Sequence, residues 1–464
     1  MSRDRKRQLS WYQPDDTEAI ARHLERMAGK GWLLEKVDNW LFTYRRAQPA
    51  RVRYTVTFFP EASVFDPGLT RGQETYADYC QAAGWELAAA YGPIQYFRSV
   101  CPDPTPIETD EAVKLSAIRR TMRKTSVLSY ALLLLLPLVY LPLLSIQLRR
   151  PMEFFSSSSQ LAQLALMAGI VVFSAGMLLD YLAWVLLSRR AVARGGACAR
   201  PHTRFRLGLT AVMMALCAAV LAALLLDPPL SGTQPALLAF LALYGGAMLL
   251  GRWILRRLKK RGVSRDNAKG LYFVFALAAG LIVGFGTPIL FGALSGAGVM
   301  HTGREPAETY VKAYGNDSRT ITWDVFYDDL PVTLEDLGFP VTPEDHCTYE
   351  AEVSRSPLAA QARYTQDALN SDSSLPRLVC QTYDTRWSWL LKRCWEKLTA
   401  GGSGEPWPMQ RLDPAPWGAA EAYQEVGYDS YLLLYPERIV TFRLYGGASP
   451  EQLDSIALAL RPAS

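Results

Sequence analysis

The sequence has few of the residues on which most enzyme chemistry depends. Of its 464 residues, 4 are histidine and 7 are cysteine, and the histidines are scattered along the chain. It contains no phosphate-binding Gly-x-x-x-x-Gly-Lys-Ser/Thr loop, no His-Glu-x-x-His motif, no Gly-x-Ser-x-Gly motif and no Cys-x-x-Cys pair. We therefore predict that the protein is not an enzyme and that it holds no cofactor or metal.

Charge is nearly absent from five long stretches in the middle of the chain. Each stretch reaches the roughly 20 apolar residues that a helix needs to cross the hydrocarbon layer. A helix is the expected form, because in lipid the backbone must satisfy its own hydrogen bonds. We predict five transmembrane helices, over residues 126–146, 161–187, 207–226, 236–255 and 271–291. The fourth is the least regular, because Arg252 lies within it.

Basic residues mark one side of this membrane region. Lysine and arginine crowd residues 114–124, 189–206 and 252–269, whereas residues 227–235 contain neither. Because basic loops stay in the cytoplasm, this pattern predicts a multi-pass protein of the cell membrane, embedded in the lipid bilayer, with a cytoplasmic N-terminus. Five crossings then place residues 301–464 outside the cytoplasm.

Two polar segments flank the predicted spans. We expect a membrane protein with a cytosolic α+β domain at residues 1–113, a five-helix region at residues 114–300 and an acidic extracytoplasmic α+β domain at residues 301–464. The whole chain has a formal net charge of +5. Because much of the basic excess lies beside the spans, where anionic lipids attract it, we predict no direct binding to nucleic acid.

The cytosolic segment contains an internal repeat. Met27 to Arg45 aligns without a gap on Cys80 to Arg98, which places Gly31-Trp32 on Gly84-Trp85. In each copy a helical pattern ends at glycine and tryptophan begins a strand pattern. We predict a duplicated helix-strand-strand unit that folds as one antiparallel sheet covered by two helices. The aromatic residues Trp32, Trp40 and Trp85 are expected to pack in the core, or alternatively to form a groove for a protein partner.

The repeat carries a family resemblance. The residues concerned are Trp11-Tyr12-Gln13, Glu18, Leu24, Met27, Gly31-Trp32 and Ala83-Gly84-Trp85. Over about residues 10–100 the chain resembles the bacterial family called Domain of Unknown Function 2812. The resemblance implies several membrane spans after this domain, a Gram-positive bacterial source and a gene near that of a PadR-like transcription regulator. It implies no activity and no functional residue, because none is defined for the family.

One acidic residue interrupts an apolar run. Asp180 lies nine residues before Arg189 and next to aromatic residues, near the predicted inner interface. It is expected to sit at that interface or to pair with an arginine. The alternative is a proton or ion site, because an ionisable group within a membrane is costly and usually functional.

Small residues follow regular spacings in the third and fifth spans. They are Ala211, Ala215, Ala219 and Ala223 in the third, and Gly280 and Gly284 in the fifth. Small side chains let helix backbones approach closely. We expect these positions to pack within the five-helix bundle, or alternatively to form the face of a homodimer.

The outer segment has strand patterns and an acidic patch. Asp328, Asp329, Glu335 and Asp336 lie close together in the sequence and are expected to form a solvated face, or alternatively to attract a divalent ion or a cationic peptide. Among Cys347, Cys380 and Cys394 one disulfide is possible, and the sequence does not decide its pairing.

Two functions fit this organisation. The first is a membrane-anchored signalling or regulatory protein that relays an extracytoplasmic signal to a cytosolic protein partner, for which a PadR-like regulator is the candidate. The second is a transport accessory protein or small transporter that uses Asp180 within the helix bundle.

Overall fold

The computed structural model describes residues 4–10, 12–13, 15–38, 41–101, 103–226, 234–296, 307–314, 319–370, 373–400, 409–445, 452 and 455–456; within these ranges, side chains are not described at residues 223–226, 234–240, 283–288, 290–296, 312–314 and 319–322. The chain divides into two units. The first comprises Met1–Leu138, Leu166–Ala219 and Gln234–Val299, and the second comprises Val139–Ala165, Val220–Thr233 and Met300–Ser464. Each unit is described by itself.

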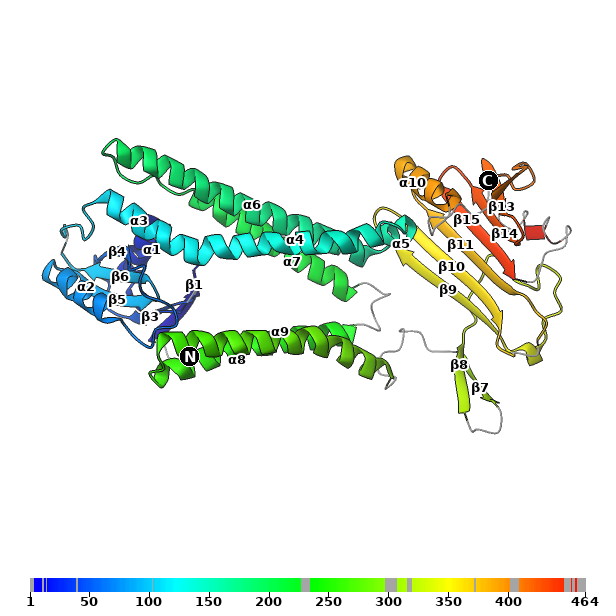
Figure 1. Cartoon of the computed structure of the whole chain (residues 1–464), viewed down its shortest axis with the longest axis horizontal. Coiled ribbons are helices and arrows are strands. Elements are labelled where there is room, and N and C mark those ends of the chain that lie inside the picture. Colours follow the sequence, from blue (N-terminus) through cyan, green and yellow to red (C-terminus); the bar gives the residue numbers. More distant parts are fainter. Residues whose placement is uncertain are drawn as a thin grey trace. The chain divides into compact units, whose positions relative to one another are not determined.

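The first unit begins with a domain built from two copies of one β-α-β-β motif (Figure 1), here called the repeat domain. Copy 1 contains β1 (Arg5–Leu9), α1 (Thr17–Gly29), β2 (Trp32–Asp38) and β3 (Leu41–Arg46). Copy 2 contains β4 (Arg53–Phe58), α2 (Arg71–Ala82), β5 (Glu86–Tyr91) and β6 (Ile94–Ser99). The predicted duplication is therefore present, and each copy has a further strand, β1 or β4, before its helix-strand-strand unit.

The prediction of a single sheet was wrong. The described strands of the repeat domain form two antiparallel three-stranded sheets, with orders β1-β3-β2 and β4-β6-β5. The reason is that each copy supplies its own third strand, which pairs with the last strand of the same copy. The two sheets meet where β2 lies close to β5.

The backbones of the two copies share their irregular features. The β2–β3 ladder shifts register between Leu34 and Lys36, and the β5–β6 ladder shifts between Leu87 and Ala89. These pairs occupy the same positions in the gapless alignment of the repeat. Gly31 and Gly84 also correspond, and they have positive φ angles of 80° and 83°. Glycine adopts this left-handed conformation without the steric cost that a Cβ atom brings.

The cores of the two copies differ. The apolar face of α1, which includes Ile20, Leu24 and Met27, belongs to a large buried cluster shared with β2, β3 and β4. Copy 2 has a small separate cluster of Cys80, Trp85 and Phe97. Copy 1 is thus joined to neighbouring elements, whereas part of copy 2 packs on itself.

Seven α-helices lie within the described part of residues 100–300. They are α3 (Glu111–Met122), α4 (Leu128–Gln147), α5 (Pro151–Ser156), α6 (Ser158–Ala193), α7 (Thr203–Leu226), α8 (Gln234–Lys260) and α9 (Arg265–Gly296), and a π-helical turn at Arg123–Val127 joins α3 to α4. Among the described residues, three helical stretches are long and apolar enough to cross a membrane: Glu111–Gln147, Ser158–Ala193 and Thr203–Ala222. These correspond to the first three predicted spans. Helices occupy the fourth and fifth predicted spans too, but five spans are not supported by this criterion.

Helix α6 packs closely on α7. A Cβ atom added to Gly169 would lie 2.3 Å from Leu216 Cδ2, and one added to Gly176 would lie 2.8 Å from Leu209 Cδ2. Both distances are too short for real contacts, so α7 approaches α6 at two glycines one heptad apart. Between these two glycines, Phe173 of α6 contacts Tyr130 of α4, and their ring centroids are 5.9 Å apart.

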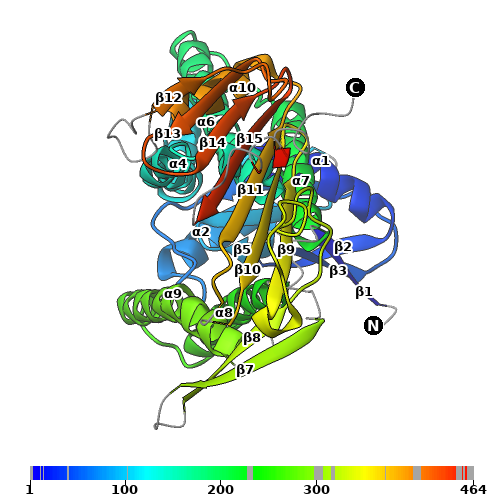
Figure 2. The same cartoon turned by 90° about the vertical axis from the view of Figure 1, so that its right-hand side faces the viewer.

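The second unit is dominated by a seven-stranded antiparallel sheet (Figure 2). Its order is β12-β13-β14-β15-β11-β10-β9. The strands are β9 (Cys347–Arg355), β10 (Ala360–Ala368), β11 (Arg377–Asp384), β12 (Met409–Leu412), β13 (Glu421–Glu425), β14 (Ser430–Leu434) and β15 (Arg438–Tyr445). A separate hairpin of β7 (Glu308–Tyr314) and β8 (Arg319–Val325) precedes them.

Both faces of this sheet are covered. On one face, helix α10 (Ser388–Thr399) packs Leu390, Cys394 and Trp395 against strand residues such as Tyr383. The other face carries Cys380 in a cluster closed by Val332, Leu334, Leu337 and Trp417. The alternation of side chains along the strands therefore produces two cores.

Candidate functional site

A cluster of buried charges lies where copy 1 of the repeat domain meets helices α6 and α7. Arg206 is the fourth residue of α7, and its Nη1 donates to both oxygens of Asp15, at 2.7 and 2.8 Å. The Nε of the same guanidinium donates to Asp180 of α6. Asp16 completes the cluster, with Oδ1 3.9 Å from Arg206 Nη1. These four residues are here called the Arg206 cluster.

Neutral and half-exposed groups extend the Arg206 cluster. Thr203 at the start of α7 donates its hydroxyl to Asp16 Oδ1 at 2.9 Å, and the Gln13 backbone N–H donates to Asp16 Oδ2 at 3.0 Å. His202 Nδ1 lies 2.9 Å from Asp180 Oδ1. Asp16 occupies the N-cap position of α1, yet its side chain makes no cap hydrogen bond. Its carboxylate serves this junction instead of the helix end.

The Arg206 cluster is almost completely removed from solvent. The side chains of Asp15, Asp16, Asp180 and Arg206 are 0%, 2%, 5% and 5% exposed. Burial raises the pKa of Asp15 and of Asp16, and the charge of Arg206 opposes this rise in both cases. Three carboxyl groups thus share one guanidinium, an arrangement that is strongly destabilised when a partner is removed.

Apolar contacts and a folded-back loop surround the cluster. Tyr181 and Trp184 of α6 belong to the same buried core as Leu115 and Ile118 of α3 and the apolar face of α1. Trp184 Nε1 donates to the carbonyl of Ala199 at 2.7 Å, which ties the loop between α6 and α7 back to α6. The end of α6 is therefore part of the core of the repeat domain.

Asp180 is paired with an arginine, but the partner is not the nearby Arg189. Nine residues along a helix correspond to a rotation of about 900°, which places two side chains on opposite faces. Arg206 instead reaches Asp180 from the neighbouring helix. Asp15, Asp16 and Arg206 were missed by the sequence reasoning. Two features of the sequence indicate the pairing of Asp180 with Arg206. One is a lone buried acid that requires a counter-charge, and the other is a basic residue at the start of the next span.

The three tryptophans of the predicted groove lie in different settings. Trp85 is 5% exposed in the core of copy 2, and its Nε1 donates to the carbonyl of Thr105 at 2.7 Å. Trp32 is half-buried, with Lys6 Nζ 6.0 Å from its ring centroid. Trp40 lies outside the described residues.

The predicted small-residue positions are not in the α6–α7 contact. Ala211, Ala215, Ala219 and Gly280 are exposed within the chain, and a Cβ atom added to Gly280 would meet no atom within 4 Å. The side chains at Ala223 and Gly284 are outside those described. Close packing of α6 on α7 uses Gly169 and Gly176 instead, so the homodimer face remains a prediction.

Three of the four outer acidic residues accept hydrogen bonds from neighbouring loops and strands. Asp328 accepts from the Ala351 N–H at 2.7 Å, and Asp336 accepts from the Thr333 backbone and hydroxyl at 3.0 and 2.9 Å. Glu335 accepts from the Tyr349 hydroxyl and from Gln366 Nε2. Asp329 is exposed. These contacts fix the segment before β9.

Cysteines and metal ligands add no further site in the parts of the chain that are described. All seven cysteines are free thiols, and Cys380 and Cys394 lie in the cores on opposite faces of the large sheet. No group of three or more histidine, cysteine, aspartate or glutamate residues among those described could hold a metal ion.

Comparison with known proteins gives a family for the N-terminal region. No curated protein and no solved structure matches the chain. A family model does match, from the start of α1 to the beginning of α4. The resemblance seen in the repeat is thereby confirmed: residues 16–130 match the family described as "Protein of unknown function (DUF2812)".

Proposed function

We propose that the protein is a membrane-anchored signalling or regulatory protein. In this proposal it crosses the cell membrane five times, with the repeat domain in the cytoplasm and the large sheet outside. It relays an extracytoplasmic signal to a cytosolic protein partner, for which a PadR-like transcription regulator is the candidate. Helices α8 and α9, with 27 and 32 residues, are long enough to supply the fourth and fifth spans.

The observation that carries this proposal is the Arg206 cluster. It joins the segment before α1 to α6 and α7, which include two of the three stretches long and apolar enough to cross a membrane. Because the charges are buried and mutually paired, they hold one relative position of these elements better than an exposed pair would. A displacement of α6 or α7 would therefore be passed to the repeat domain.

The large sheet domain has a comparable attachment in its own unit. Between α4 and α6, Ser156 donates to Gln361 Oε1 at 3.2 Å, and the Phe155 carbonyl accepts from the Ser356 hydroxyl at 2.5 Å. The rings of Phe155 and Trp389 have centroids 5.9 Å apart in an edge-to-face arrangement. The connection between the first two predicted spans is thus held by β10, the β9–β10 turn and α10, as a relay from the outer domain requires.

Copy 2 offers the more accessible surface for a cytosolic partner. Helix α2 buries only Gln73 and Cys80, and its Tyr79 is 74% exposed. Large exposed aromatic residues are frequent anchors in protein interfaces. We place the partner on the α2 side of the repeat domain, because α1 packs against α3 and α6.

The test is crosslinking in native membranes through a photoreactive residue at position 75, an exposed position of α2 one helical turn before Tyr79, with an affinity tag at the N-terminus. Recovery of a PadR-like regulator is expected, together with its loss in Tyr79→Ser. A matched control is Leu9→Ser on copy 1, where Leu9 is 56% exposed. Recovery of only self-copies or transporter subunits would overturn the partner assignment.

The transport alternative places a demand on Asp180 that its contacts oppose. Its two oxygens already interact with Arg206 and His202. A transported cation would have to displace Arg206 from Asp180, and this displacement would also disturb Asp15. We therefore prefer the relay proposal.

A further inference from the structure

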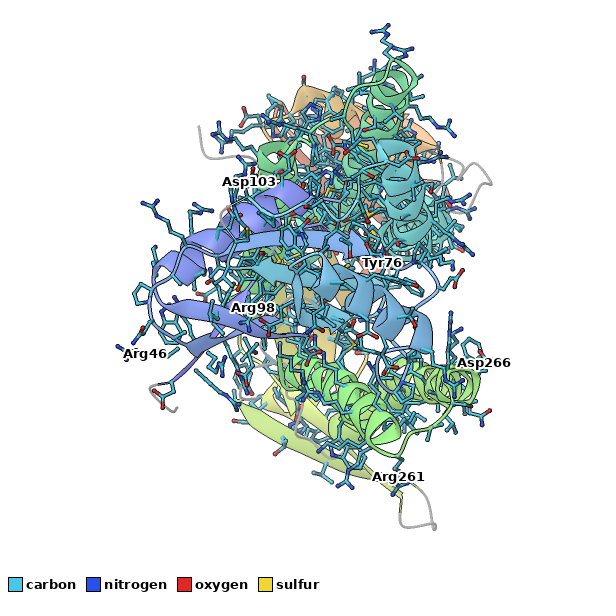
Figure 3. All side chains as sticks on the ribbon, turned by 90° about the vertical axis from the view of Figure 1, so that its left-hand side faces the viewer. Arg46, Tyr76, Arg98, Asp103, Arg261 and Asp266 are labelled. Atoms are coloured by element: carbon cyan, nitrogen blue, oxygen red, sulfur yellow. The ribbon has the colours of Figure 1, made fainter. Side chains whose placement is uncertain are left out.

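A cleft separates the repeat domain from the α8–α9 hairpin within the first unit. It has a volume of about 620 Å³. Its sides are held by three contacts: Arg256 Nη2 donates to Asp38 Oδ2 at 2.7 Å, Arg265 Nη1 donates to the Glu61 carbonyl at 2.7 Å, and Phe65 meets Tyr272 edge-to-face at 5.6 Å. Figure 3 shows the turn of this hairpin, marked by Arg261 and Asp266, beside the repeat domain.

The cleft has an excess of positive charge. Lys36, Arg252, Arg256 and Lys259 line it, against the carboxylates of Asp38 and Asp66. Arg256 pairs with Asp38, while Asp66 accepts from the Ser63 N–H at 2.6 Å and lies 3.9 Å from Arg265. Lys36, Arg252 and Lys259 form no ion pair with any described residue.

Burial disfavours the charged form of Lys259. It lowers the pKa of the ammonium group, and the nearby charges of Asp38 and Asp66 offset the effect only in part. A bound anion would stabilise the charged form of Lys259 and raise its pKa again. The cleft is thus electrostatically complementary to an anion.

The face of α8 that lines the cleft carries both apolar and basic residues. Met248, Arg252, Leu255 and Lys259 all line the cleft, at spacings of four, three and four residues. Residues at these spacings share one face of a helix. Along this face, apolar and basic residues alternate and the last residue is basic. Tyr272 of α9 adds a further aromatic surface.

We propose that this cleft binds an anionic phospholipid. Arg252, Lys259 and Lys36 contact the phosphate of its headgroup, and the acyl chains follow α8 past Leu255 and Met248. Basic pockets between helices on the cytoplasmic side are suited to such headgroups. The apolar lining favours a lipid over a soluble phosphate compound. The inference rests on the membrane anchoring proposed above, but not on the signal relay.

The test uses the full chain in detergent and native mass spectrometry. Delipidated protein is titrated with phosphatidylglycerol, with phosphatidylcholine and with inorganic phosphate. We expect phosphatidylglycerol to bind preferentially. The double variant Arg252→Gln/Lys259→Gln should bind it about 25-fold more weakly, because each basic charge contributes about fivefold. The matched control is Arg257→Gln/Lys260→Gln, which removes two exposed charges from the same helix outside the cleft lining.

Three results would overturn the proposal. Equal weakening in the two double variants would mean general attraction to basic residues. Equal binding of phosphatidylcholine would remove the role of headgroup charge. Displacement of the lipid by inorganic phosphate at equal concentration would assign the site to a soluble phosphate compound.

If the double variant fails to fold, as judged by its elution volume, the single variant Arg252→Gln serves, with an expected loss of about fivefold. Lipid binding without recovery of a cytosolic regulator would leave this inference intact and reject only the relay.

Discussion

The two copies of the repeat have the same backbone but different surroundings. They share strand order, a register shift at equivalent positions and a glycine with positive φ. Copy 1, however, contributes its helix and strands to a core that includes Trp184 of α6, whereas copy 2 retains a small core around Trp85. The comparison teaches that the glycine, tryptophan and strand pattern specify the motif, while a few side chains outside it decide which of the two motif helices, α1 or α2, packs against α3 and α6.

The largest expected effect comes from breaking the attachment of copy 1. Replacing Arg206 by methionine leaves Asp15, Asp16 and Asp180 buried without their shared cation. We expect the free energy of unfolding of the first unit to fall by about 3–5 kcal/mol, as for other broken buried ion pairs. Chemical denaturation in detergent, followed by tryptophan fluorescence, measures this change. Arg204→Met is the control, because Arg204 is an exposed neighbour on the same helix; equal losses in the two variants would contradict the role of the cluster.

A second test compares the two tryptophans. Trp85→Ala should destabilise the protein by about 3 kcal/mol, because it removes most of a small core and leaves the Thr105 carbonyl without its donor. Trp32→Ala should cost about 1 kcal/mol, because Trp32 is only half-buried. The same denaturation measurement applies. A larger loss at Trp32 would show that copy 1 depends on this residue more than its burial indicates.

The glycines provide a finer comparison. Gly84→Ala should destabilise the protein by about 1–2 kcal/mol, the usual penalty for a side chain in the left-handed region. No steric clash adds to this penalty, because the new Cβ atom would meet no atom within 4 Å. At Gly31 the Cβ atom would also lie 2.8 Å from the carbonyl oxygen of Ala47. We therefore expect Gly31→Ala to cost roughly 1 kcal/mol more than Gly84→Ala. Equal melting temperatures for the two variants would refute this difference.

The smallest expected effect is the pH dependence that Asp15 and Asp16 contribute. The pKa values of Asp15 and Asp16 are raised above the ordinary 3.8, so the folded state holds their protons more tightly than the unfolded state. Their contribution to stability is full below about 3.8 and is lost as pH rises through the raised folded-state values. The denaturation midpoint of wild type should thus fall more steeply than that of Asp15→Asn/Asp16→Asn in a pH series from about 4 upward. Parallel slopes would argue against the predicted titration.

Periodicity predicted most of the repeat domain because helix and strand spacing are local properties. It missed β1, whose sequence RKRQL contains three basic residues. An edge strand tolerates such charge, and β1 lies at the edge of its sheet. In the outer segment, local patterns indicate strands but not their order in the sheet, because neighbours such as β11 and β15 are distant in the sequence.

The candidate site could be predicted only in part, because its contacts are between distant segments. Asp180 was visible as a charge within an apolar run. Its partner Arg206 lies 26 residues after it in the sequence, and Arg206 in turn lies 191 residues after Asp15. Such pairings depend on how helices pack and how the α6–α7 loop folds back, which a local pattern does not encode.

The length of helix α6 has a consequence for its motion. With 36 residues it is about 54 Å long, whereas the hydrocarbon layer is about 30 Å thick. Nearly half of its length must therefore extend beyond that layer if the helix runs straight across. Because the helix is stiff, a tilt of about 10° about one end moves the other by about 9 Å. Trp184 and Asp180 lie toward the C-terminal end of α6. A small change in the tilt angle of the helix therefore becomes a displacement large enough to reposition a folded domain.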